Sequence, residues 1–368
     1  MKGFPTAHNA CALLLMVVAF LTGPAAAGKG SQPWTEVEIK LPTGEAEVVL
    51  GCTLTLPGGK GPFPGAVLLT VAGPNDRDQT VFAHKGFADL AHGLGAAGIA
   101  SLRCDDRGVG RSTGTYLEAS YDDLADTALA CHKALAERPE VDSAQVGFIG
   151  NSEGGAIGPL AASREEAVAF VVLLAGPGVP GAVILQGQLD AAITTLGIGE
   201  EKAAALRKQL VLFLEIQKKD PSAESTRREM RAFLEAGGRS LFPPYAFIPR
   251  DLGQLTDYLL SPWHRSMVAH DPAAILRELQ QPVLALAGDK DRVLDPDVHL
   301  VAIREALQNN PDATVELLPG LNHLFQTANT GSVLEYAMLP EAISPAAVSK
   351  VGGWIAAQSQ ATRRPERN

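Results

Sequence analysis

The stretch GFIGNSEGGAIG, Gly147–Gly158, surrounds a single serine with glycines. The apolar run Val146–Ile149 before it predicts a strand, and the small residues after it predict a helix. A strand that passes directly into a helix must bend sharply. The sequence therefore predicts a tight strand–helix turn with Ser152 at its apex.

Gly150–Gly154 reads G-N-S-E-G and fits the pattern G-x-S-x-G. Between a strand and a helix, this pattern is typical of a nucleophile elbow, in which a strained serine stands clear of the sheet. The following helix N-terminus favours negative charge, and the backbone N–H of Glu153 is placed to stabilise an oxyanion. Ser152 is the predicted nucleophile; the alternative is a glycine-rich turn with an incidental serine.

A serine hydroxyl needs a base at neutral pH, and after such an elbow the acid and then the histidine follow in the chain. LALAGDKDRVLDP supplies Asp289 and Asp291 just after a predicted buried strand. Asp291 is favoured as the acid because it lies further into the loop, and Asp289 is expected to serve the turn. LPGLNHLFQ, after the next strand, supplies His323 as the predicted base. The other histidines lie in predicted helices, in the leader or in the insertion.

A second oxyanion donor is expected in the loop TVAGPNDRD, Thr70–Asp78, after the third predicted strand. Pro74 has no N–H, so the candidates are the backbone amides of Ala72 and, one residue on, Gly73. One such donor typically stabilises the transition state by about 3 kcal/mol.

Charged residues gather in this loop and in DDRGVGRS, Asp105–Ser112. They are expected to form ion pairs that brace the oxyanion loop. The alternative is a site for a substrate carboxylate at Arg77 or Arg107, which the neighbouring acids disfavour because they would pair with the arginines.

Predicted strands alternate with predicted helices along most of the chain, which indicates an α/β fold with a mostly parallel sheet and helices on both faces. Two polar–apolar alternating segments, TEVEIKL and AEVVLGCTLTLP, predict an antiparallel pair at the start. Residues 178–270 break the alternation with segments of helical periodicity. Since this insertion leaves from a strand's carboxyl end, it is predicted to be a helical cap over the site, on a core of residues 28–177 and 271–368. The alternative is a helical decoration remote from the chemistry.

The first 27 residues have the order of a secretory signal peptide. Lys2 precedes the apolar run Ala10–Leu21, and Ala25 and Ala27 occupy the small positions of a cleavage site. The run is shorter than the roughly 20 residues of a membrane span, although an uncleaved anchor helix is the alternative. The sequence thus predicts a secreted or periplasmic protein without a stable membrane anchor after cleavage.

Amino-acid composition and net charge limit the kinds of binding partner that are expected. The 368 residues are 46% hydrophobic and carry a net charge of −10, which argues against nucleic acid and anionic membrane surfaces. Cys52, Cys104 and Cys131 form an odd set without metal spacing, so we expect small buried side chains and no disulfide framework. The sequence implies no metal and no cofactor.

The chain contains five distinctive motifs, which are in chain order AGPNDRD, RCDDRGVGRSTG, GNSEGG, AGDKDRVLDP and LPGLNHLFQTANTG. With this set the chain resembles the secreted bacterial α/β-hydrolases related to EstD-type carboxylesterases and serine aminopeptidases. The resemblance covers nearly the whole mature chain and implies the α/β-hydrolase fold. It places the family's nucleophile on Ser152, its acid on Asp291 and its histidine on His323. Where relatives often have His-Gly-Ser-Gly-Pro, this chain has Thr70–Pro74.

The expected activity is hydrolysis of small carboxylic esters through an acyl-enzyme on Ser152, with the amides of Ala72 and Glu153 holding the oxyanion. The alternative enzyme is a serine peptidase acting on short peptides. A non-catalytic binding module on the same fold is the alternative from another class.

Overall fold

The computed structural model describes residues 32–242 and 248–362. These residues contain an eight-stranded sheet. Its order is β1-β2-β6-β3-β7-β8-β9-β10, with β2 antiparallel to both β1 and β6 and the remaining neighbours parallel. The predicted signal peptide, residues 1–27, lies outside the described residues. The strands of this sheet are β1 (Trp34–Pro42), β2 (Val49–Pro57), β3 (Phe63–Leu69), β6 (Ala100–Cys104), β7 (Val141–Asn151), β8 (Val171–Leu174), β9 (Val283–Gly288) and β10 (Ala313–Leu318).

The central strands are buried on both faces, as their continuous apolar sequences predict. Every residue of β8, VVLL, and of β9, VLALAG, is buried. At the edge, β1 is mostly exposed and its polar residues alternate with apolar ones. This pattern places the antiparallel pair at one side and the parallel strands at the centre, where their carboxyl ends share one edge.

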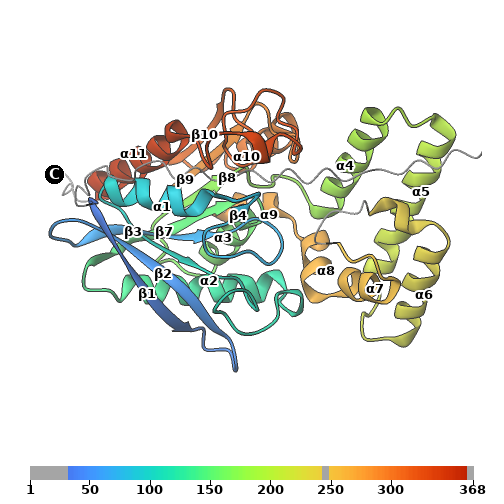
Figure 1. The fold of residues 1–368 in the computed structure, drawn as a ribbon, viewed down its shortest axis with the longest axis horizontal. Helices are drawn as coiled ribbons and strands as arrows, with labels where there is room; N and C mark the ends of the chain where they lie inside the picture. The colour runs from blue at the N-terminus through green and yellow to red at the C-terminus, as the bar shows by residue number, and fades with distance from the viewer. Residues whose placement is uncertain (1–31, 243–247, 363–368) are drawn as a thin grey trace, which may run out of the picture. The chain divides into compact units, whose positions relative to one another are not determined.

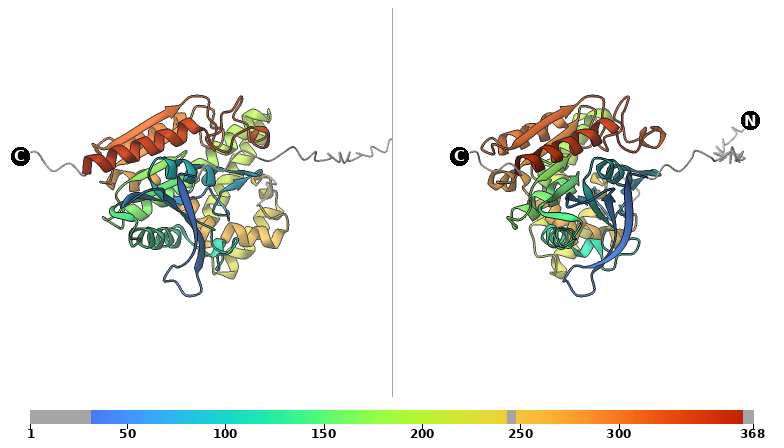
Figure 2. Two further views of the ribbon diagram at one scale, coloured as in Figure 1. Left: turned by 60° about the vertical axis from the view of Figure 1, so that its left-hand side comes forward. Right: turned by 90° about the vertical axis from the view of Figure 1, so that its left-hand side faces the viewer.

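Helices cover both faces of the sheet (Figures 1 and 2). On one face, Leu94 and Ile355 pack in a cluster with Ile149 of β7. On the other face, Leu135 and Ile303 pack in a cluster with Phe148 of the same strand. The first face carries α1 (Gly86–Ala96) and α11 (Pro345–Thr362); the second carries α2 (Tyr121–Ala136), α3 (Gly154–Ala162), α9 (Pro272–Glu278) and α10 (Pro296–Ala306).

The insertion between β8 and β9 is helical throughout its described part, with short turns between the helices (Figure 1). Its apolar side chains, among them Phe213 and Trp263, continue the hydrophobic cluster that contains α2 and α3. Ser266 Oγ accepts a hydrogen bond of 2.9 Å from the Tyr121 N–H, which ties the insertion to the start of α2. The elements are α4 (Gly181–Thr195), α5 (Glu200–Gln217), α6 (Glu224–Glu235), η2 (Gly238–Leu241), α7 (Leu252–Leu260) and α8 (Pro262–Ala269).

One predicted helix starts later than expected. The helical pattern from Phe82 predicts a helix to Ala97, but α1 begins at Gly86 because a small hairpin precedes it. Phe82 and Ala83 both have positive φ, 48° and 71°, the conformation of a two-residue turn that joins antiparallel strands. The remaining short elements are β4 (Thr80–Val81), β5 (His84–Lys85), η1 (Tyr116–Glu118) and η3 (Tyr336–Met338).

The cysteine expectation is wrong for two of the three residues. Cys52 and Cys104 are directly opposite each other on β2 and β6 and form a disulfide, with a Cα–Cα distance of 4.0 Å. Cys131 of α2 is a free buried cysteine, as predicted, and its Sγ lies 3.8 Å from that of Cys104. The pairing depends on strand register, which cysteine count and spacing cannot reveal.

Candidate active site

The turn between β7 and α3 is a strained elbow. Ser152 has a φ of +53°, a left-handed conformation that costs a residue with a side chain about 1–3 kcal/mol. A Cβ on Gly150 would lie 2.0 Å from the carbonyl oxygen of Gly154, and a Cβ on Gly154 would lie 2.2 Å from that of Leu69. The two glycines therefore let β7, α3 and β3 touch. The Ser152 N–H donates to Leu174 O at 2.8 Å and fixes the elbow to β8.

Three predicted site residues follow strand ends on the same edge of the sheet. Ser152 follows β7, Asp291 follows β9 and His323 follows β10, and these strands and β8 are neighbours running parallel. The Lys290 N–H donates to Leu321 O at 3.0 Å, so the loops after β9 and β10 lie side by side. The topology thus gathers the candidate nucleophile, acid and base.

Asp291 and His323 are hydrogen-bonded. His323 Nδ1 lies 2.7 Å from Asp291 Oδ2, and both residues are buried. The other carboxylate oxygen, Oδ1, accepts the N–H groups of Val293 at 2.8 Å and Leu294 at 2.9 Å. Since an ionised carboxylate only accepts, Nδ1 of His323 carries the proton and Nε2 is left free to accept one.

Asp289 has a different contact. Its Oδ1 accepts the Gly320 N–H at 2.6 Å and so joins the ends of β9 and β10. Of the two acids after β9, Asp291 is therefore the one that contacts His323.

The loop that carries His323 is held by Asn322, which the sequence reasoning did not single out. Asn322 Oδ1 accepts the N–H groups of Leu324 at 3.0 Å and Gln326 at 2.9 Å, and its Nδ2 donates to Gln326 Oε1 at 3.0 Å. Phe325, with a φ of +60°, completes this tight turn. An asparagine directly before the histidine was the available signal, because asparagine commonly binds the backbone of its own turn.

Within residues 32–242 and 248–362, no hydrogen bond joins the Ser152 hydroxyl to His323. Such bonds are often long in enzymes without substrate and tighten in the complex. The structure thus brings Asp291 to His323 and places Ser152 on the same edge of the sheet.

The two candidate oxyanion donors in the loop Thr70–Asp78 differ in their hydrogen bonds. The Gly73 N–H already donates to the Tyr116 hydroxyl at 3.3 Å. The N–H groups of Ala72 and Glu153 have no hydrogen-bond partner among the described residues. Of the two candidates in this loop, the Gly73 amide is therefore engaged within the protein, whereas the Ala72 amide has no such partner among the described residues.

Polar side chains that the sequence did not single out hold this loop in place. Gln79 Oε1 accepts the Val71 N–H at 3.1 Å, and its Nε2 donates to Asn151 Oδ1 at 2.9 Å, next to Ser152. Asn75 Nδ2 donates to the carbonyl oxygens of Val71 at 2.8 Å and Gly73 at 2.6 Å. Side-chain amides thus connect the oxyanion loop to the elbow.

Ion pairs surround the loop. Arg77 donates twice to Asp105, from Nε at 3.0 Å and from Nη2 at 2.7 Å. It also pairs with Glu38 at 2.7 Å. Arg107 pairs with Glu45 at 2.7 Å. Both arginines are thus engaged by carboxylates of the chain, so neither is a free site for a substrate carboxylate.

A second buried histidine lies near the pair. His299 of α10 accepts the Gly178 N–H on Nδ1 at 3.0 Å. Burial lowers the pKa of His299 to about 4, against the opposing charges of Asp291 and Asp295. The ring is therefore neutral at neutral pH and packs beside the site.

Neither a metal-binding cluster nor a membrane-spanning helix is found in the described ranges. No group of three or more His, Cys, Asp or Glu side chains there could hold a metal ion. No helix in the same residues has the length and apolar character needed to cross a bilayer.

A family model described as Serine aminopeptidase, S33, matches residues 83–327, about two thirds of the chain. The chain belongs to this hydrolase family. The matched range contains Ser152, Asp291 and His323, whereas Ala72 lies before it.

Several known proteins resemble this chain in sequence or in fold. Esterase EstD of Thermotoga maritima is 26% identical over 302 residues, which are 82% of this chain and 64% of the relative, less than two thirds of its length. Est1E from Butyrivibrio proteoclasticus, solved with ferulic acid, has a TM-score of 0.52 at 15% identity, covering 88% of this chain and 99% of that one. Proline iminopeptidase of Mycobacterium smegmatis has a TM-score of 0.52 at 16% identity, covering 89% and 100%. The predicted α/β-hydrolase fold is confirmed.

Proposed function

We propose that this S33-family protein is a serine hydrolase that cleaves carboxylic esters through an acyl-enzyme on Ser152. The observation that carries the proposal is the 2.7 Å contact between Asp291 and His323, on the sheet edge where the Ser152 elbow stands. The similarity to a protein named an esterase supports the choice of substrate class.

In the proposed reaction, Ser152 Oγ attacks the acyl carbon while His323 Nε2 takes the hydroxyl proton. The N–H groups of Ala72 and Glu153 stabilise the oxyanion of the tetrahedral intermediate. The C–O bond to the leaving alcohol then breaks, and His323 returns the proton to that oxygen. A water molecule, deprotonated by His323, attacks the acyl-enzyme and releases the acid and free Ser152.

In this proposal Asp291 orients the imidazole and stabilises its charged form. Its two bonds to backbone N–H groups keep the carboxylate in place. His323 becomes cationic beside a buried carboxylate, which offsets the cost of charging a buried ring.

The alternative is peptidase activity on short peptides, which the family description and the proline iminopeptidase likeness suggest. The test compares turnover of p-nitrophenyl acyl esters with that of aminoacyl p-nitroanilides, with Ser152→Ala as the blank. Faster ester turnover, absent from the variant, supports the proposal. Faster anilide turnover would instead assign a peptidase, and no turnover of either would leave a binding module.

We also propose that the insertion, residues 178–270, acts as a cap, and that residues 1–27 direct export. The disulfide between Cys52 and Cys104 supports export, because such bonds persist in oxidising compartments. The mass of the protein recovered from the periplasm or medium tests this: removal of the first 27 residues is expected.

A further inference from the structure

The side chain of Glu153, the residue after the nucleophile, is a buried carboxylate without a cationic partner. It is 6% exposed, and no lysine, arginine or histidine of the described chain forms an ion pair with it. Its Oε1 accepts the Trp263 Nε1–H at 2.7 Å, and its Oε2 accepts the Tyr116 hydroxyl. The Tyr121 hydroxyl also lies close enough to this carboxylate to lower its pKa. Burying a carboxylate costs free energy unless it is hydrogen-bonded, so the Glu153 side chain depends on these donors.

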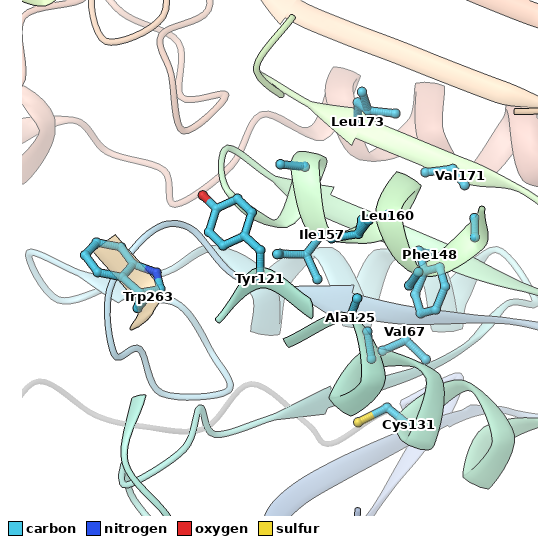
Figure 3. Close-up of a cluster of buried hydrophobic side chains, with 14 of the residues drawn as sticks. Val67, Tyr121, Ala125, Cys131, Phe148, Ile157, Leu160, Val171, Leu173 and Trp263 are labelled. Atoms are coloured by element: carbon cyan, nitrogen blue, oxygen red, sulfur yellow. The ribbon is translucent and has the colours of Figure 1, made fainter. Parts of the chain in front are cut away.

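The donors come from separate parts of the fold. Tyr116 belongs to η1, Tyr121 begins α2, and Trp263 lies on α8 of the insertion. Figure 3 shows Tyr121 and Trp263 at one end of the cluster of buried side chains that includes Ile157 and Leu160 of α3. The rings of Tyr116 and Trp263 are 5.6 Å apart. Glu153 therefore joins the insertion to the elbow.

The same tyrosine reaches the oxyanion loop. A carboxylate can only accept, so the single proton of the Tyr116 hydroxyl points to Glu153. The lone pairs of that hydroxyl are then free to accept the Gly73 N–H at 3.3 Å. Glu153 thus sets the direction of the bond that holds Gly73, the neighbour of Ala72.

We propose that the Glu153 side chain is a positioning residue for the oxyanion hole. Through Tyr116 it holds the Ala72–Gly73 backbone, and through Trp263 it makes the geometry of the hole depend on how α8 is seated. The inference rests on the proposed function of Ser152 and adds a role for the insertion in the chemical step.

The ionisation states of the two tyrosines agree with this geometry. Burial raises the pKa values of Tyr116 and Tyr121 well above their ordinary value, and the charge of Glu153 adds to this, so both hydroxyls stay neutral donors. Burial also raises the pKa of Glu153, while the bonds from Tyr116, Tyr121 and Trp263 lower it. The net effect is a raised pKa, because burial outweighs the three donors, which oppose it only in part.

The test removes single donors while keeping the rings. Tyr116→Phe deletes the bridge between Glu153 and Gly73, and Glu153→Gln is the second variant. Tyr258→Phe is the matched control, since Tyr258 is a buried tyrosine with its ring centre 5.7 Å from that of Trp263, and it has no hydrogen bond to Glu153 in the described chain. We expect Tyr116→Phe to lower kcat on p-nitrophenyl acetate about tenfold with KM nearly unchanged, and Tyr258→Phe to leave both within about twofold.

The link to the insertion has its own variant. Trp263→Phe is expected to lower kcat severalfold in the wild-type background and to have no further effect when Glu153 is already glutamine. Equal effects of Trp263→Phe in both backgrounds would show that α8 acts independently of Glu153 and would overturn that part of the proposal.

A readout that does not depend on activity separates this inference from the proposed function. We expect the Gly73 amide to exchange its hydrogen faster in Tyr116→Phe and Glu153→Gln than in wild type and Tyr258→Phe. Unchanged exchange, or a rise in KM without loss of kcat, would overturn the positioning role. Failure of wild type to react with a fluorophosphonate at Ser152 would overturn the proposed function instead, and the exchange experiment would still decide the contact.

Discussion

Asp291 is held so that only one orientation of its side chain fits. Its Oδ1 accepts two backbone N–H groups and its Oδ2 faces His323 Nδ1. In Asp291→Asn, the amide oxygen must take the side of the two N–H groups, so the NH₂ group faces His323. The ring then carries its proton on Nε2 and cannot accept the Ser152 proton. We expect kcat to fall about 10³- to 10⁴-fold on p-nitrophenyl acetate.

The matched control is Asp289→Asn, two residues earlier. Asp289 contacts the Gly320 N–H, which an asparagine oxygen also accepts, so kcat is expected to stay within a fewfold of wild type. Equal losses in the two variants would show that Asp291 is not the orienting acid.

The elbow predicts an intolerance to side chains at Gly150. A methyl group there would meet Gly154 O at 2.0 Å, and the three nearest atoms all belong to the backbone of Gly154 and Gly155, which cannot rotate away as a side chain could. Gly150→Ala is expected to destabilise the fold by more than about 3 kcal/mol or to abolish soluble protein. Gly187→Ala, in open space on α4, is expected to be neutral or to stabilise by up to about 1 kcal/mol. Urea unfolding of both variants measures the difference, and similar midpoints would contradict the elbow geometry.

Among single residues, Ser152, Asp291 and His323 can be predicted from the sequence, because each follows a predicted strand and the carboxyl ends of parallel strands meet at one edge of the sheet. The contacts of Tyr116 and Gln79 cannot be predicted in this way. Their partners lie far along the chain, and nothing local marks a tyrosine that contacts both the oxyanion loop and the elbow.

Among the elements, the β2–β6 pair contains the disulfide that the sequence analysis did not predict. Cys52 and Cys104 are 52 residues apart and meet only through strand register. The strands themselves follow from their alternating and apolar sequences. The small hairpin before α1 could not be predicted, because two-residue strands carry almost no periodicity.

The disulfide predicts a stability difference. Replacing both Cys52 and Cys104 by alanine removes a cross-link that restricts the unfolded chain, and we expect a loss of about 2–4 kcal/mol in the free energy of unfolding. Cys131→Ala, which removes a buried thiol without a cross-link, is expected to cost less. Urea unfolding under non-reducing conditions compares the variants, and an unchanged midpoint in the double variant would refute the cross-link.

For the molecule as a whole, a buried acid makes stability depend on pH. Burial raises the pKa of Asp106 from 3.8 to about 7, and the charge of Glu153 adds to this, while bonds from Asn75 and Thr70 oppose it. The folded protein therefore keeps a proton that the unfolded chain releases. This contribution to stability is complete below about pH 4 and is lost as the pH rises through 7.

Asp106→Asn keeps the oxygen that accepts from Thr70 and the Asn75 N–H but cannot titrate. The free energy of unfolding of wild type is expected to fall relative to this variant between pH 5 and pH 8. Urea unfolding at several pH values measures that difference, and Asp122→Asn, at an exposed site, gives the baseline. A constant difference across this range would show that Asp106 is ionised throughout.

The central claim is that Ser152 is the nucleophile and that His323 activates it. The most direct measurement is labelling of the folded protein with a fluorophosphonate, followed by peptide mass spectrometry to locate the adduct. The account predicts one adduct, on Ser152, that is absent from Ser152→Ala and forms far more slowly in His323→Gln. Labelling of another residue, or equal labelling rates in wild type and His323→Gln, would contradict it.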